Sequence, residues 1–342
     1  MVFPQPPEHD LTHEASGWTR GSLLELSAAY WQSCTLHAAV VLDIVTVLDT
    51  RSMTAAALAA KLRTDLRGTE VLLDALSALG LLTKQDASYT ATSAAFRLLH
   101  RDSPDYLGHI IRHHHHLVDG WAQLDQAVTS GKPVAMRSHG TEQERESFQL
   151  GMCNLAMGIA PQMASQLDLA GFHHLLDLGG GPGTYAIHFC LANPQLRATV
   201  FDRPTSREYA LATAADFQVA DRLAFVAGDF TADPLPGEYD VAWLSHILHS
   251  YPPETCEAIL IKTLAAMQPG GLIIIHEFFL NHAKDGPLFP ALFSLNMLLN
   301  NQGGRSYTVQ EISAMLTRHG VGKIRLLDFR GPNDSGVLCG TV

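Results

Sequence analysis

Hydrophobic spacing in the first hundred residues predicts helices followed by a hairpin. Apolar positions recur with a helical period across 23–48, 54–62 and 68–82, and leucines in the last two segments lie one turn apart. We expect Thr54 and Thr69 as N-caps, because a threonine hydroxyl accepts hydrogen bonds from the free N–H groups of a first helical turn. Two short β-prone pieces follow around a polar turn, so the order of elements is typical of a winged-helix domain.

The next segment, 106–170, is predicted to be a helical connector. Apolar and polar residues are mixed at helical spacing, a Ser-Gly-Lys-Pro break follows at 130–133, and one long helix is expected over 142–167. We therefore place the first domain at 1–105 and this connector between it and the rest of the chain.

From Gly171 onward, short apolar runs alternate with helical segments. These runs cover 175–178, 198–201, 223–227, 241–244 and 272–275. Apolar strands separated by helices are typical of a parallel sheet buried on both faces. Two final runs, 324–329 and 337–342, enclose a turn-rich loop and predict an antiparallel pair at the sheet edge. The expected fold class is α/β, with a Rossmann-like domain of seven mostly parallel strands over 171–342 and a mostly α winged-helix domain before it.

Composition and charge narrow the possible partners. The chain has 342 residues, 46% of them hydrophobic, and a formal net charge of -11. That length allows two domains, and the negative charge disfavours nucleic acid and anionic membranes as partners. Five scattered cysteines without a C-x-x-C pair predict neither a disulfide framework nor a zinc finger. Because the sequence shows no secretory leader and no long apolar run, we expect a soluble cytoplasmic protein.

A glycine-rich loop is the strongest functional signal in the sequence. The apolar run 175–178 leads directly into Gly179-Gly180-Gly181-Pro182-Gly183 and then into a helical stretch. A strand, a glycine turn and a helix N-terminus in this order are typical of a nucleoside-binding loop, because glycine lets the backbone approach the ligand closely.

Two cofactors compete for this loop. Residues 181–186 also satisfy the G-x-G-x-x-A pattern of dinucleotide-binding proteins, with Asp202 at the next strand end, so a NAD-dependent oxidoreductase is an alternative. Asp177 before the glycines, and Asp229 and Phe230 after the third strand, favour S-adenosylmethionine instead. In this interpretation Asp202 accepts from both ribose hydroxyls, Asp229 accepts from the adenine amino group, and Phe230 covers the adenine ring. An N-cap or a solvated turn is the alternative role for either aspartate.

Longer segments carry a family resemblance. They read LLDLGGGPGTYAIHF, TVFDRP, AGDF, LSHILHSYPPE, MQPGGLIIIHE and LNMLLNNQGGRSYTVQEI. In these the chain resembles the S-adenosylmethionine-dependent O-methyltransferases of the plant caffeate and hydroxyindole type, and their bacterial relatives that act on polyketides and other aromatic metabolites. The resemblance implies a dimerisation domain at 1–105, a connector at 106–170 that contributes to the acceptor pocket, and a methyltransferase domain at 171–342. It also implies a homodimer through the N-terminal domain, a small-molecule acceptor, S-adenosylhomocysteine as the product, and no metal.

The resemblance also assigns catalytic residues. The family reads L-H-D-W after its fourth strand, where this chain reads Leu248-His249-Ser250-Tyr251, so His249 inherits the role of general base. Ser250 and Ser306 replace two acidic residues of the family, whereas Glu277, at the end of the fifth strand, keeps the third. We therefore expect Glu277 to orient His249.

Four further positions match residues that line the acceptor pocket of the family. They are Phe148, Met152, Met297 and Asn301. Packing on a helix face explains Phe148 and Met152 equally well. Ser245 matches a position that contacts the cofactor and is usually lysine.

Histidines near these positions are further candidates for contact with the acceptor. His246, three residues before His249, is expected to share a helical face with it. The run from His113 to His116 cannot converge on one metal ion, because consecutive helical residues point about 100° apart. His116 and Trp121 remain as candidates for contact with the acceptor.

The winged-helix outline raises a different class of function, a ligand-responsive DNA-binding regulator. Residues 1–105 hold eight basic and twelve acidic side chains, and the expected recognition helix at 68–82 has no basic residue, which argues against it. Within methyl transfer, the two replaced acids leave C-methylation of an acidic carbon as an alternative to O-methylation.

Overall fold

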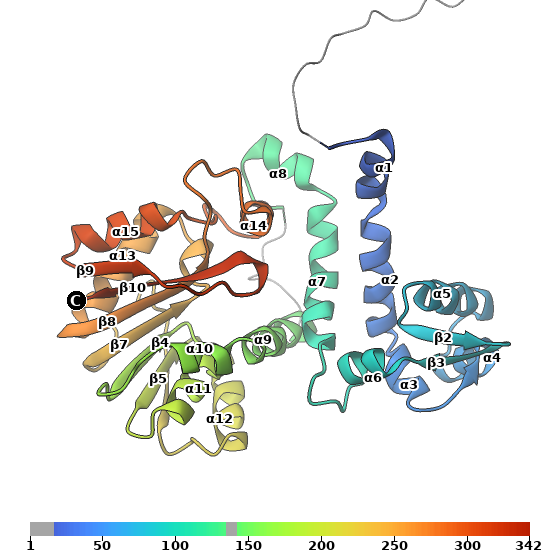
Figure 1. The fold of residues 1–342 in the computed structure, drawn as a ribbon, viewed down its shortest axis with the longest axis horizontal. Helices are drawn as coiled ribbons and strands as arrows, with labels where there is room; N and C mark the ends of the chain where they lie inside the picture. The colour runs from blue at the N-terminus through green and yellow to red at the C-terminus, as the bar shows by residue number, and fades with distance from the viewer. Residues whose placement is uncertain (1–16, 135–141) are drawn as a thin grey trace, which may run out of the picture. The chain divides into compact units, whose positions relative to one another are not determined.

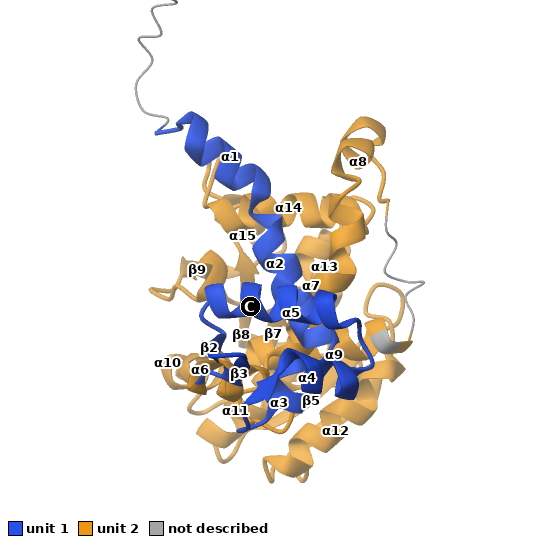
Figure 2. Ribbon diagram, turned by 90° about the vertical axis from the view of Figure 1, so that its right-hand side faces the viewer, with its two compact units in different colours: residues 1–92 blue, residues 93–342 orange. Residues whose placement is uncertain are grey.

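The computed structural model describes residues 17–134 and 142–342, and it divides into two compact units. Unit 1 is Met1–Thr92 and unit 2 is Ser93–Val342, as Figure 2 shows in two colours. The structure therefore has one boundary, before residue 105, and the segment 106–170 belongs to the same unit as the sheet. The connector helices join that unit because they pack on helices that flank the sheet.

Unit 1 begins with three helices in place of the single one expected over 23–48. They are α1 (Arg20–Ala28), α2 (Tyr30–Val41) and α3 (Ile44–Leu48). Asp43 separates the last two, because its φ of 58° lies in the left-handed region that ends a right-handed helix. The rest of the unit consists of α4 (Ala55–Leu62), α5 (Leu66–Ala78) and the strands β1 (Met53–Thr54), β2 (Leu82–Gln85) and β3 (Ser88–Ala91).

Two N-caps were predicted in unit 1, at Thr54 and at Thr69. Thr54 caps α4 as expected, since its side chain accepts from the backbone N–H of Ala57. The prediction for Thr69 is wrong, because Asp65 caps α5 earlier and leaves Thr69 inside the helix. The longer α5 includes Arg67, a basic residue outside the expected range 68–82. The strands form one antiparallel sheet in the order β1-β3-β2.

Unit 2 starts with helices. They are α6 (Ser93–Leu99), α7 (Gly108–Trp121), α8 (Leu124–Ser130), α9 (Glu142–Met157) and α10 (Ala160–Gln166). The one long helix expected over 142–167 is two helices. Gly158 and Ile159 separate them, and Pro161 in the first turn of α10 cannot continue the hydrogen-bond ladder of α9.

A seven-stranded sheet forms the centre of unit 2 (Figure 1). The parallel strands are β4 (His174–Leu178), β5 (Arg197–Asp202), β6 (Leu223–Ala227), β7 (Tyr239–Ser245) and β8 (Met267–Phe278). β10 (Ser335–Thr341) lies antiparallel between β8 and β9 (Gly322–Leu326), and the order is β6-β5-β4-β7-β8-β10-β9. The predicted α/β class with an antiparallel edge pair is confirmed.

Helices cover both faces of this sheet and bury a core on each. One core joins sheet residues such as Leu175 to α10, α11 (Thr184–Ala192) and α12 (Arg207–Asp216). The other joins residues such as Leu176 to α13 (Pro253–Ala265) and α15 (Val309–Arg318). α14 (Leu288–Asn300) follows β8. Because neighbouring residues of a strand point to opposite faces, both faces of each central strand are apolar, as the sequence runs indicated.

The carboxyl ends of the five parallel strands meet at one edge of the sheet, and Asp177, Asp202, Ser245 and Glu277 lie at or near these ends. No helix within 17–134 or 142–342 combines the length and hydrophobicity needed to cross a bilayer.

Candidate active site

The glycine loop connects β4 to α11 with a backbone that only glycine adopts easily. Gly179, Gly181 and Gly183 have φ values of 67°, 52° and 72°. A Cβ added at Gly179 would lie 2.3 Å from Cδ1 of Ile247, so no larger residue fits there without movement. The loop therefore presents bare backbone at the N-terminus of α11, as a nucleoside-binding loop requires.

Asp202 ends β5 and lies against this loop. Its Oδ2 accepts a hydrogen bond from the backbone N–H of Gly181 at 2.7 Å, so the carboxylate is fixed beside the glycines. Burial raises the pKa of Asp202, and the backbone N–H groups of Arg203 and Gly181 partly offset that effect. Gly181 and Asp202, both predicted to belong to the cofactor site, are thus in contact.

Asp177 lies beneath the loop and is almost completely buried, with 1% of its surface exposed. Neither carboxylate oxygen has a hydrogen-bond partner among the described residues. Burial raises the pKa of Asp177 to about 7, the negative charge of Asp202 acts in the same direction, and the backbone N–H of Ala186 partly offsets both effects. A buried acid with so little hydrogen bonding is costly, which indicates that a positively charged or hydrogen-donating group belongs nearby.

The segment after β6 reaches the loop from the other side. The ring of Phe230 lies 3.2 Å from the position that a Cβ on Gly179 would take, so this ring borders the loop as expected for an adenine cover. Asp229 uses Oδ1 to accept from the backbone and hydroxyl of Thr231, which is the turn geometry weighed as an alternative. Ser245 ends β7 and its hydroxyl lies 3.0 Å from Nδ1 of His276.

Gln149 also lies near the loop, although the sequence did not indicate it as a site residue. Gln149 on α9 donates from Nε2 to the hydroxyl of Ser206 at 3.1 Å. Its Oε1 is buried without a hydrogen-bond partner in the described part of the chain and lies 3.5 Å from the position that a Cβ on Gly181 would take. A glutamine in an amphipathic helix carries no sequence signal for such a role, because only the docking of α9 on α11 brings it there.

His249 and Glu277 form a buried pair at the same edge of the sheet. His249 lies in the short 3-10 helix Leu248–Ser250 after β7, and Glu277 lies near the end of β8. Nδ1 of His249 and Oε2 of Glu277 are 2.8 Å apart, and the side chains are 8% and 4% exposed. Burial alone would raise the pKa of Glu277, but His249 and His246 together hold this pKa well below its usual range. An ionised carboxylate therefore accepts the Nδ1 proton and leaves Nε2 of His249 able to accept another.

Aromatic rings surround this pair. The ring of His249 stacks with Phe278 at 6.3 Å between centroids and meets the edge of Phe293 at 4.8 Å. Phe289 contacts both phenylalanines. The ring centroids of His246 and Phe278 are 4.2 Å apart with the rings tilted by 32°, and Nδ1 of His246 is 3.7 Å from Oε2 of Glu277. His246 therefore lies beside His249 and Glu277, but it precedes the 3-10 helix Leu248–Ser250 and has a φ of 57°, so the expected shared helical face is wrong.

The two serines that stand in place of the family's acidic residues have different surroundings. Ser306 is buried and donates its hydroxyl proton to the carbonyl oxygen of Pro290 at 2.9 Å, so it ties α14 to its neighbouring loop. Ser250 is half-buried at the end of the 3-10 helix. Glu277 is the only carboxylate in the described residues that the structure pairs with His249.

Most of the expected acceptor residues lie on α7, α9 and α14, and α7 contacts both of the other helices. Phe148 is half-buried and meets the ring of His113 edge-on at 5.3 Å, and Met152 lies one turn further along α9. Met297 is fully buried, and its sulfur accepts from Nδ2 of Asn301 at 3.1 Å. Trp121 is half-buried at the end of α7, whereas His116 is exposed.

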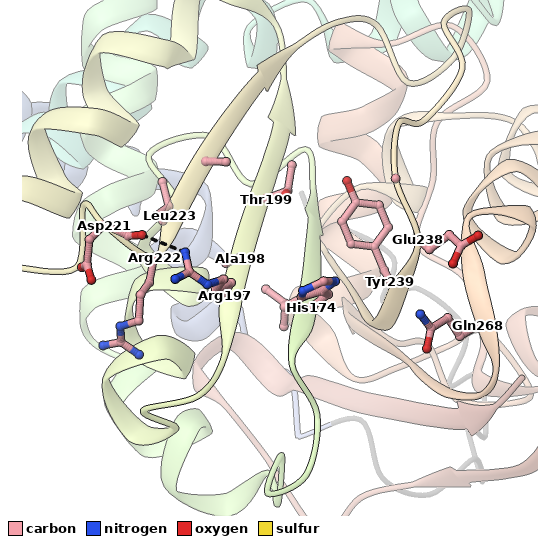
Figure 3. A pocket seen from close by; sticks show the side chains of 13 residues that line it. His174, Arg197, Ala198, Thr199, Asp221, Arg222, Leu223, Glu238, Tyr239 and Gln268 are labelled. Atoms are coloured by element: carbon pink, nitrogen blue, oxygen red, sulfur yellow. Dashed lines mark hydrogen bonds between the residues drawn. The ribbon is translucent and has the colours of Figure 1, made fainter.

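A separate cavity of 510 Å³ lies at the opposite edge of the sheet, near the amino ends of the parallel strands (Figure 3). Its lining includes His174, Arg197, Arg222 and Tyr239. Arg222 donates to the carbonyl oxygen of Cys190 at 2.6 Å, which ties this arginine to the end of α11. The cavity is remote from the carboxyl strand ends and contains none of the predicted site residues.

Comparison with known proteins decides the family. A family model described as an O-methyltransferase domain matches residues 115–322, and one described as an O-methyltransferase dimerisation domain matches residues 24–101. The chain belongs to the O-methyltransferase family. The resemblance drawn from the sequence motifs is thereby confirmed.

Individual O-methyltransferases are similar over nearly the whole chain. The 3-hydroxy-5-methyl-1-naphthoate 3-O-methyltransferase of Streptomyces sahachiroi is 33% identical over 93% of this chain and 94% of its own. The tetracenomycin polyketide synthesis 8-O-methyl transferase TcmO of Streptomyces glaucescens is 32% identical over 92% and 94%. The structure of PigF with S-adenosylhomocysteine, a methyltransferase from a Serratia species, superimposes with a TM-score of 0.87 at 29% identity, covering 95% and 100%.

This protein is an S-adenosylmethionine-dependent O-methyltransferase. Its own residues fit that cofactor. Asp177 and Gln149 offer buried acceptor oxygens without partners, and the glycine loop leaves a cradle that a Cβ would fill. These features surround Asp202, which is where ribose hydroxyls are expected.

Proposed function

We propose that this enzyme methylates a hydroxyl group of an aromatic or conjugated small molecule and that His249 is the general base. The observation that carries the proposal is the hydrogen bond of 2.8 Å between Nδ1 of His249 and Glu277, at the strand edge that also bears the glycine loop. This bond fixes the tautomer in which Nε2 holds a free electron pair.

The protein has two tasks in this reaction. S-adenosylmethionine supplies an electrophilic methyl group on a sulfonium, and the sulfur keeps the bonding electron pair when the methyl leaves. The acceptor oxygen forms the new bond to carbon while Nε2 of His249 takes its proton. Glu277 stabilises the imidazolium that results, because it remains ionised beside it. Holding the oxygen in line with the methyl group supplies the rest of the rate gain.

The acceptor class follows from the rings beside His249. Phe278, Phe289 and Phe293 place aromatic surfaces next to the base, and a flat conjugated acceptor packs well against such surfaces. The names of the relatives from Streptomyces, a naphthoate and a polyketide methyltransferase, support the same class. The proposed acceptor site also includes Phe148 and Met152 on α9, Met297 on α14, Asn301 directly after α14, and His246 directly after β7. Its outer candidates are Trp121 and His116 on α7.

The proposed cofactor site combines predicted residues with one new member. Asp177, Asp202, Asp229, Phe230, Ser245 and the glycines at 179, 180, 181 and 183 come from the sequence motifs. Gln149 joins them through its buried Oε1. We also propose a homodimer through the N-terminal unit, since the dimerisation-domain match and the exposed apolar side chains of α1 and α2 both favour it.

The experiment is incubation of the enzyme with methyl-labelled S-adenosylmethionine and a panel of hydroxylated naphthoates, polycyclic phenols and 1,3-dicarbonyl compounds. Label on oxygen in an aromatic acceptor supports the proposal, and nuclear magnetic resonance separates it from label on carbon. Label found only on carbon would replace O-methylation by C-methylation as the activity of this chain.

A further inference from the structure

Two histidines and one carboxylate converge at the carboxyl edge of β7 and β8, which are neighbouring strands (Figure 1). Nδ1 of His249 is 2.8 Å from Oε2 of Glu277, and Nδ1 of His246 is 3.7 Å from the same oxygen. The potential ligand atoms of the three residues all lie within 4.8 Å of one another. In the described parts of the chain, this is the one group of three or more such side chains that is close enough to hold a metal ion.

His246 takes part in none of the hydrogen bonds of the proposed reaction. Its backbone has a φ of 57°, which turns the side chain toward Glu277 after β7 ends. Its Nδ1 is buried and has no hydrogen-bond partner among the residues described, because 3.7 Å exceeds the length of such a bond. The ring of His246 packs against those of His276 and Phe278, with centroid separations of 4.4 and 4.2 Å. An unpartnered nitrogen thus points at a carboxylate that already binds a second imidazole.

Two imidazole nitrogens and one carboxylate oxygen form a donor set that suits Zn²⁺ and similar divalent ions. Zinc bonds to these atoms are about 2.0 to 2.2 Å long, so tetrahedral ligand atoms lie roughly 3.3 to 3.5 Å apart. The two separations from Oε2 of Glu277, 2.8 and 3.7 Å, bracket that range, and all three ligand atoms lie within 4.8 Å of one another, so side-chain rotation is required to equalise them. The pair His319 and Glu257 shows the contrast, because Arg318 occupies the same carboxylate oxygen there.

We propose that His246, His249 and Glu277 form a binding site for a divalent transition-metal ion such as Zn²⁺, and that occupation of this site stops methyl transfer. This departs from the expectation of no metal drawn from the sequence. Inhibition, unlike binding, rests on the proposed role of His249. A metal on Nδ1 of His249 takes the electron pair of that nitrogen, so the single proton of the neutral ring moves to Nε2. Nε2 then has no electron pair with which to accept the proton of the acceptor hydroxyl.

The test is direct metal binding to the full-length enzyme after dialysis against a chelator. Isothermal titration with Zn²⁺ and visible absorption on titration with Co²⁺ are measured for the wild type and for His246→Asn. Asparagine is chosen because it tolerates positive φ and offers no imidazole. His319→Asn is the matched control, since it removes a histidine from another pair with a glutamate. Circular dichroism checks that both variants are folded.

We expect one tight Zn²⁺ per wild-type chain, an intense tetrahedral Co²⁺ spectrum, and unchanged binding in His319→Asn. Loss of a ligand in His246→Asn should weaken binding by at least about 10-fold. Equal binding in the wild type and His246→Asn would overturn the proposal, because the ion would then sit on other surface histidines. In a methyl-transfer assay, Zn²⁺ should inhibit the wild type and EDTA should restore it. Binding that depends on His246 without inhibition would overturn the inhibitory role and contradict His249 as the base.

Discussion

Glu277 holds His249 at two points: Oε2 accepts from Nδ1 at 2.8 Å and Oε1 accepts from the backbone N–H at 3.3 Å. The double contact fixes both the position of the residue and the tautomer of its ring. In the proposed mechanism, Glu277 alone would orient His249, because Ser250 and Ser306 stand at the two positions where the resemblance to the family implies further acids.

The first prediction concerns Glu277→Gln. The amide NH₂ would donate to Nδ1 and favour the tautomer that carries the proton on Nε2, so kcat should fall by about 100-fold or more. Ser250→Ala and Ser306→Ala are the matched controls, and each should cost much less. Steady-state kinetics with separate kcat and KM values measure this. A loss in Ser250→Ala larger than the loss in Glu277→Gln would contradict the assignment.

Asp202→Ala should weaken binding of both S-adenosylmethionine and S-adenosylhomocysteine. The loss of hydrogen bonds to a charged group corresponds to roughly 10- to 150-fold in affinity. Asp216→Ala, an exposed aspartate at the end of α12, is the control and should bind normally. Calorimetry measures both, with NAD as a competing ligand. Tight NAD binding that Asp202→Ala abolishes would favour the dinucleotide alternative.

The raised pKa of Asp177 leads us to expect that the free energy of unfolding depends on pH. Its pKa is about 7 in the folded protein and near 3.8 in a model peptide, so between these values the unfolded chain ionises first and the folded state loses stability as the pH rises. The loss is complete above the folded pKa. Asp177→Asn cannot ionise, so its melting temperature relative to the wild type should increase from pH 5 to pH 8 without cofactor. A difference in melting temperature that is independent of pH would contradict the buried, protonated acid.

The apolar residues of α1 and α2 predict the dimer contact. Leu24 and Trp31 are 62% and 64% exposed in the single chain. Leu24→Glu should raise the dimer dissociation constant by about 10-fold or more if this side chain lies in the contact. Val128→Glu on α8, an equally exposed apolar position, is the control. Light scattering measures the mass, and a monomeric wild type with full activity would contradict the dimer.

Sequence patterns predicted the sheet well because buried parallel strands have a strong local signature. All five apolar runs are strands, and the glycine loop lies between the first strand and α11. Helix boundaries were harder to predict, since they depend on competition between neighbouring residues. Asp65 caps α5 in place of Thr69, and Gly158 with Pro161 divides the helix expected over 142–167.

The pair His249 and Glu277, which we propose is catalytic, was predictable only through family resemblance, and the residues around it were not predictable in detail. Gln149 approaches Gly181 because α9 docks on α11, which no periodicity indicates. The side chain of His246 is directed at Glu277 because the backbone of His246 has a positive φ, which non-glycine residues adopt only rarely. Local sequence describes elements, whereas convergence of side chains from different elements requires the tertiary fold.

The most direct test of the central claim is turnover of His249→Ala, measured with cofactor affinity across about pH 6 to 9. General bases contribute about 100- to 10,000-fold, so kcat should fall by at least about 100-fold. The dissociation constant for S-adenosylhomocysteine should stay the same, because His249 lies outside the proposed cofactor site, and His319→Ala should retain full activity as the control. Near-normal turnover of His249→Ala at every pH would contradict the account, since the acceptor would then arrive already ionised and need no base.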